Sequence, residues 1–274
     1  MKKTLISFAI LALICLSASA QRKIGIKEVY KDSNVMFNQI DDHTWVGTGN
    51  LCYNESLYLI EGNDKAILID AGTKIPGLKK IVESITSKPV TLLATHVHGD
   101  HTGEAINEFD KIYISPGDTV MIPANVKDFF KGEILYLKDG EKIDLGGRVI
   151  DVIFTPGHTY GSVSFFDKDK GYGFSGDAFG SGNLLVFTDF TTLKNGCEKV
   201  IPYLEKNKIK FMYPGHYWGD NLETTQRVKD LKSISDDVLS GKIKADKNTG
   251  DNYGLDNIID KFGVKVNYNS KAIK

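Results

Sequence analysis

Short apolar runs recur along the chain, separated by clusters of Gly, Asn, Asp and Pro. In the first half these runs predict strands at residues 35–40, 43–47, 56–61, 65–71, 90–94 and 111–115. Leu78, Ile81, Val82 and Ile85 recur at helical spacing, which predicts an amphipathic helix between the fourth and fifth of these strands. A short helix is expected at 103–109, and 116–130 is expected to be helix or irregular cover.

The second half repeats this pattern. Apolar runs predict strands at 134–137, 148–155, 162–167, 171–175 and 210–213, and helices at 191–206 and around the stripe of Val228, Leu231, Ile234 and Val238. Residues 250–268 read as a short apolar segment followed by a polar tail. Two β-rich halves, each covered by helices, predict an α/β fold with helix, sheet, sheet and helix layers. We expect one domain over residues 21–274.

Residues 1–20 have the pattern of a secretory signal peptide. Lys2 and Lys3 give a basic start, residues 5–16 are largely apolar, and 18–20 read Ala-Ser-Ala, a small-residue cleavage site. The structural alternative is a buried N-terminal strand or helix. We expect the mature chain to be exported to the periplasm or secreted, without a membrane anchor.

The charge balance narrows the range of partners. The chain has 34 Lys and Arg against 35 Asp and Glu, and no basic run stands out. We therefore expect a small-molecule substrate and no nucleic-acid partner. Cys52 and Cys197 are expected to be free buried thiols, although an exported protein could pair them. The sequence does not specify the oligomeric state.

Residues 95–101, which read Thr-His-Val-His-Gly-Asp-His, follow the predicted strand at 90–94. A loop at a strand end can direct His96 and His98, two residues apart, toward one point. Asp100 and His101 then face a second point nearby. Imidazoles and carboxylates bind zinc and similar ions, so this loop predicts a two-metal site. A His-rich surface tract is the alternative.

Three later strand ends each offer one more ligand. The predicted strand at 148–155 runs into Pro-Gly-His158, the one at 171–175 into Gly-Asp177, and the one at 210–213 into Pro-Gly-His216.

These motifs in this order, with Leu-Ile-Asp-Ala-Gly upstream at 68–72, resemble those of the metallo-β-lactamase-fold superfamily, from about residue 35 to 239. The resemblance implies an αββα sandwich of two mixed sheets, with the site at the edge between them. It also implies a ligand set: His96, His98 and His158 for the first metal, Asp100, His101 and His216 for the second, and Asp177 bridging both. Asp70 would hold the ligand loop without contacting metal.

Such a site would bind two Zn²⁺, or other first-row divalent ions. Two ions that share a water lower its pKa toward neutrality and provide a bridging hydroxide. We therefore expect a hydrolase acting on an ester, lactone, β-lactam or related bond, with thioesters and amides in the same chemical range. Asp100 is also a candidate for passing a proton to the leaving group.

Several branches of the superfamily fit less well. The β-lactamase subclass with Cys at position 177 and a Lys shortly after is disfavoured, because 176–180 read Gly-Asp-Ala-Phe-Gly. The diiron oxidase branch has Glu in place of His98, and the glyoxalase II branch carries a helical C-terminal domain that is not expected here. Lactonases and phosphodiesterases share the bridging Asp and stay open. A non-catalytic metal-containing binding protein is the alternative outside enzymes.

Aromatic residues beside the ligands are candidates for a substrate rim: Tyr160, Phe179, Tyr217 and Trp218.

Overall fold

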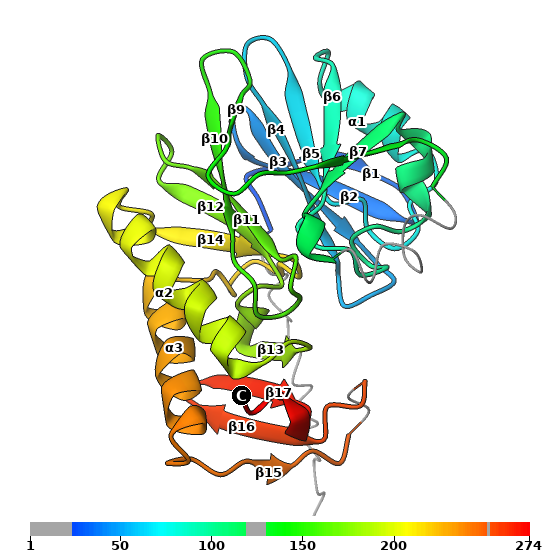
Figure 1. The fold of residues 1–274 in the computed structure, drawn as a ribbon. Coiled ribbons are helices and arrows are strands. Elements are labelled where there is room, and N and C mark those ends of the chain that lie inside the picture. The colour runs from blue at the N-terminus through cyan, green and yellow to red at the C-terminus, as the bar shows by residue number, and fades with distance from the viewer. Residues whose placement is uncertain (1–23, 119–129, 251–252) are drawn as a thin grey trace, which may run out of the picture.

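The computed structural model describes residues 24–118, 130–250 and 253–274. Their strands form two large sheets and a smaller third sheet near the C-terminus (Figure 1). The proposed signal at 1–20 and residues 119–129 of the expected cover segment lie outside the described residues. No helix in the described ranges has the length and apolar character needed to cross a bilayer.

The first sheet contains eight strands in chain order. Its first five strands pair antiparallel, and β5 to β8 pair parallel. The strands are β1 (Lys27–Lys31), β2 (Val35–Asp41), β3 (Thr44–Gly49), β4 (Ser56–Glu61), β5 (Ala66–Ile69), β6 (Val90–Leu93), β7 (Lys111–Ile114) and β8 (Glu133–Tyr136).

The second sheet has the order β14-β12-β11-β10-β9. Antiparallel pairs join β9 to β12, and β14 lies parallel to β12. Its strands are β9 (Lys142–Asp144), β10 (Val149–Phe154), β11 (Val163–Asp167), β12 (Tyr172–Gly176) and β14 (Phe211–Pro214). The strands predicted from the apolar runs are confirmed, with ends that differ by a few residues.

The two large sheets stack face to face, as β4 illustrates. Successive side chains of a strand point to opposite faces. Leu57 and Leu59 therefore pack into the cluster that contains helix α1 (Leu78–Ile85), whereas Tyr58 and Ile60 pack against the second sheet. Burial on both faces explains why this strand reads as a continuous apolar run.

Helices cover the outer faces of both sheets (Figure 1). The helix α1 lies on the first sheet, and α2 (Phe190–Lys206) and α3 (Thr225–Leu239) pack on the second. Asp189 and Thr224 cap the N-termini of α2 and α3 by accepting bonds from backbone N–H groups. The predicted four-layer αββα sandwich is confirmed. The described residues also contain short 3₁₀ turns at Glu104–Glu108, Pro116–Asp118, Gly180–Gly182 and Ser270–Ala272, the first at the expected short helix.

The third sheet was not expected from the sequence. Its order is β13-β17-β16-β15, with β13 (Asn183–Val186), β15 (Asp246–Lys247), β16 (Asn257–Lys261) and β17 (Val264–Tyr268). The segment read as an apolar stretch with a polar tail is a hairpin. Phe262 and Gly263 turn it with φ angles of 56° and 70°, where Asn-Gly would be the usual signal.

Candidate metal centre

All four ligand loops meet at one edge of the sandwich. The loop at 95–101 follows β6, His158 follows β10, Asp177 follows β12 and His216 follows β14. Two backbone hydrogen bonds join these strand ends, from Val163 N to Thr95 O and from Gly215 N to Gly176 O, each 2.8 Å long. The structure therefore brings together all seven residues predicted to bind metal.

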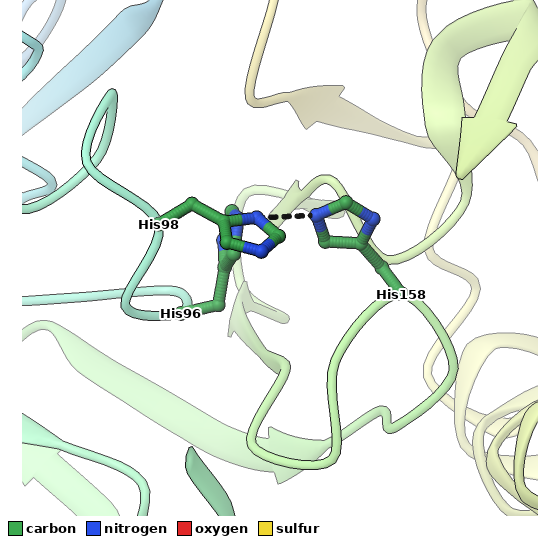
Figure 2. Close-up of side chains that lie close together, drawn as sticks. All are labelled: His96, His98 and His158. Carbon is green, nitrogen blue, oxygen red and sulfur yellow. Dashed lines mark hydrogen bonds between the residues drawn. The ribbon is translucent and has the colours of Figure 1, made fainter. Parts of the chain in front are cut away.

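The first group consists of His96, His98 and His158 (Figure 2). The Nδ1 atom of His98 lies 3.0 Å from Nε2 of His96 and 2.9 Å from Nε2 of His158. Three ring nitrogens from two loops thus converge on one point. This is the arrangement that three imidazole ligands of one ion need.

The second group consists of Asp100, His101 and His216. Oδ2 of Asp100 lies 3.5 Å from Nε2 of His216 and 3.8 Å from Nε2 of His101. These distances are longer than hydrogen bonds. They leave room between the three atoms.

Asp177 lies between the two groups. Its Oδ2 is 3.7 Å from Nε2 of His158, and its Oδ1 is 3.7 Å from Nε2 of His101. Oδ2 is also 3.4 Å from Nε2 of His216. One carboxylate therefore faces ligands of both groups, as a bridging residue would.

The donor set fits two divalent metal ions. Nε2 of His101 is buried and has no hydrogen-bond partner among the described residues, while its Nδ1 lies 2.8 Å from Asp70. A buried ring nitrogen without a partner is costly, and a metal ion would satisfy it. A carboxylate–imidazole pair of this kind is also what orients metal-bound histidines.

The first group holds neutral imidazoles. Burial, reinforced by the neighbouring imidazoles, lowers the pKa of His98 to about 3 and the pKa of His96 well below its usual value. Burial also lowers the pKa of His158. Neutral imidazole is the form that binds metal, so protons do not compete for this group at neutral pH.

The second group differs from the first because carboxylates surround its imidazoles. Burial alone would lower the pKa of His101, but Asp100, Asp177 and Asp70 outweigh it and hold that pKa well above its usual value. The imidazoles of His216 and His101 hold the pKa of Asp177 well below its usual range, against the effect of burial. Protons therefore compete with a metal ion for the His101 imidazole, which distinguishes this group from the first.

Residues behind the ligands hold the loops in place. Asp70, whose φ is 64°, accepts hydrogen bonds from N and Oγ1 of Thr95. Nδ1 of His158 donates to the Leu185 carbonyl at 2.7 Å, so β13 of the third sheet orients a predicted ligand. Asp118 accepts from N of Val97 and from the loop of His158, joining the two loops. The sequence did not single out Asp118.

The family assignment follows from a comparison with known proteins. Residues 52–216 match the profile of the metallo-beta-lactamase superfamily. This chain belongs to that superfamily.

Known relatives are distant in sequence. The human acyl-coenzyme A thioesterase MBLAC2 is 25% identical over 203 residues, which cover 59% of this chain and 72% of that protein. A hydroxyacylglutathione hydrolase of Klebsiella pneumoniae is 33% identical over 124 residues, covering 45% of this chain and 46% of the hydrolase. Among solved structures, a metallo-beta-lactamase from Pontibacter korlensis aligns with a TM-score of 0.60 and 18% identity over 74% of this chain and 99% of its own. That likeness shows the shared fold.

A pocket of about 650 Å³ opens over the two ligand groups. His98, Asp100, His158, Asp177 and His216 line its floor. The loop between β3 and β4 contributes Cys52 and Tyr53, and Asn248 follows β15. The third sheet contributes much of the rest: Asn183, Leu185, Ile258, Lys265 and Asn267. None of these sheet residues was predicted, because no motif marks them.

The predicted aromatic rim is only partly present. Trp218 lines the pocket. Phe179 and Tyr217 are 1% and 6% exposed and pack in the hydrophobic core, so neither forms a rim. Tyr160 is exposed, but its hydroxyl donates to Asp189, and it does not line the pocket.

Both cysteines of the described chain are free, as expected. Cys197 is buried in the core, whereas Cys52 is half-buried at the pocket. The Cys52 thiol donates to Oδ2 of Asp100 at 3.2 Å. Burial and the neighbouring Asp100 carboxylate raise the pKa of Cys52 to about 12, so the sulfur keeps its proton next to the candidate site.

Proposed function

We propose that this protein is a hydrolase that depends on two divalent metal ions, with zinc as the expected metal, and cleaves ester-type bonds of small molecules. The observation that carries the proposal is the pair of ligand groups joined by Asp177 at the floor of an open pocket. Membership of the superfamily supports it. Closed structural zinc sites have no such access for substrate.

The first ion would be held by His96, His98 and His158, the second by Asp100, His101 and His216, and Asp177 would contact both. When bound, the two ions would lower the pKa of a shared water and polarise the substrate carbonyl.

Side chains of the protein would carry out the remaining steps of the reaction. Asp100 belongs to the second group and lines the pocket, so its carboxylate can accept a proton from the attacking water and pass it to the departing oxygen or sulfur. Asp70 keeps His101 in one orientation throughout. The pocket walls would contact the bound substrate and fix its position.

Two observations rank the types of bond that the proposed hydrolase would cleave. One relative is named an acyl-coenzyme A thioesterase, which favours thioesters alongside esters and lactones. Asp177 stands where the β-lactamase subclass described above would have Cys, and no Lys occurs at 178–180, so we rank β-lactams lower.

The test is metal content together with a hydrolysis panel on purified protein. The panel contains an ester, a lactone, a thioester, a β-lactam and a phosphodiester, each measured with and without chelator. We expect about two zinc ions per chain and turnover of a carboxylic ester or thioester that chelator abolishes and zinc restores. Preference for the phosphodiester would indicate a phosphodiesterase. Bound metal without any turnover would indicate a binding protein.

A further inference from the structure

The third sheet presents one face to the core and the other to the pocket. On β17, Val264 and Val266 are buried in the cluster that contains α2 and α3, while the alternate residues Lys265 and Asn267 line the pocket. Ile258 of β16 pairs directly with Asn267 and also lines the pocket. The face of the third sheet that carries Ile258, Lys265 and Asn267 therefore forms one wall of the pocket.

Lys265 supplies the positive charge of that wall. Among the described residues that line the pocket, it is the only Lys or Arg. Its side chain is exposed and forms no ion pair or hydrogen bond with the described part of the chain, although Asp260 stands across from it on β16. The ammonium group is thus available to a ligand, and the stable strand pairing with β13 and β16 holds its backbone in place.

Apolar side chains line the same pocket as Lys265. Leu185, Phe187, Ile258 and Trp218 all line the pocket, and Phe187 is 37% exposed. A ligand that reaches the predicted metal ligands would therefore meet an apolar surface and one cation. Those two features together favour a ligand with an apolar portion and an anionic group.

We propose that Lys265 determines substrate specificity, by selecting esters that carry an apolar portion and an anionic group, a carboxylate or a phosphate. The inference rests on the proposed hydrolase function and names its substrate class. An ammonium-to-anion hydrogen bond at a partly exposed position contributes about tenfold in affinity. Lys265 contacts a part of the substrate that does not react, so its loss raises KM and leaves kcat nearly unchanged.

The first test measures binding without turnover. The probes are naphthalene sulfonate, an apolar anion that binds zinc weakly, and naphthyl methanol, its neutral counterpart. We expect Lys265→Ala to weaken binding of the sulfonate about tenfold in calorimetry and to leave the alcohol unchanged. Lys265→Arg should retain the preference. Lys247→Ala is the matched control, since Lys247 is exposed on the same sheet but does not line the pocket.

The second test uses three acetyl esters of similar size: methyl para-acetoxybenzoate, which is neutral, para-acetoxybenzoate, and para-acetoxyphenyl phosphate. In zinc-loaded wild type, both anionic esters should have a lower KM than the neutral ester, and the one with the lower KM of the two shows whether a carboxylate or a phosphate binds better. Lys265→Ala should remove the advantage of the anionic esters over the neutral one. Sulfonate binding and anionic-ester KM that are both unchanged in Lys265→Ala would overturn the inference. Failure of wild type to hydrolyse any of the three esters or any compound of the panel would instead refute the proposed function.

Discussion

Asp177 has contacts that differ from those of the other predicted ligands. Its Oδ2 faces His158 of the first group, and its Oδ1 faces His101 of the second. Its position at the end of β12 is set by Gly176, which has a φ of 53° and lies against Thr95. This position fits the proposed role of Asp177 as a ligand of both ions.

We predict that Asp177→Ala lowers the zinc content from about two ions per chain to about one. Turnover should fall by about a hundredfold or more, because even residues behind metal ligands cost 10–100-fold when removed. Zinc content by mass spectrometry and ester hydrolysis measure the two effects. Asp169→Ala, at an exposed carboxylate away from the pocket, serves as the control. Full zinc occupancy with an unchanged rate would rule out the bridging role.

At the scale of elements, the site depends on how closely the loops after β12, β6 and β14 approach one another. Gly215 is the point of closest approach. A Cβ atom at this position would lie 2.2 Å from Oδ1 of Asp177 and 2.7 Å from Cε1 of His101. The Pro-Gly-His motif therefore needs glycine for space, in addition to the histidine for binding.

Gly215→Ala should disrupt the second ligand group although residue 215 is not a ligand. The added methyl group displaces Asp177 or His101, so zinc at the second group should be lost and its affinity should fall by about tenfold or more, as for other changes that misplace ligands. Gly99→Ala is the matched control, because a Cβ at Gly99, in the ligand loop itself, meets no atom within 4 Å. Zinc titration of both variants measures the difference. Equal affinities would show that the loops can separate without cost.

For the whole molecule, the third sheet is joined to the αββα sandwich through its core. Ile259 is 3% exposed and packs in the cluster that includes α2, α3 and the second sheet, whereas its neighbour Ile258 faces the pocket. The backbone of β13 also accepts the hydrogen bond of His158. The single domain expected from the sequence stays a prediction, which an unfolding experiment can test.

We predict one cooperative unfolding transition for the whole chain in urea. Ile259→Ala should lower the free energy of unfolding by 2–5 kcal/mol, the range for truncating a buried Ile. Ile258→Ala should change it by less than about 1 kcal/mol. Intrinsic fluorescence, circular dichroism and loss of zinc should report the same midpoint. A separate early transition that Ile259→Ala alone shifts would mean that the third sheet is an independent unit.

The parts of this protein that depend on local order along the chain could be predicted. Apolar runs mark the strands of both large sheets except β1 and β9. The ligands follow strand ends, so His96, His98 and Asp177 could be named in advance. The profile of the superfamily covers the same segment, residues 52–216.

Only the tertiary structure decided which side chains reach the pocket. Trp218 lines it while Phe179 is buried, although both stand beside ligands in the sequence. Lys265 lies 49 residues after the last ligand, on a strand whose partner β13 precedes α2. Such long-range pairing depends on the packing of the whole core. A local pattern of alternating residues marks the two faces of a strand, but it does not specify which face will lie next to a distant ligand loop.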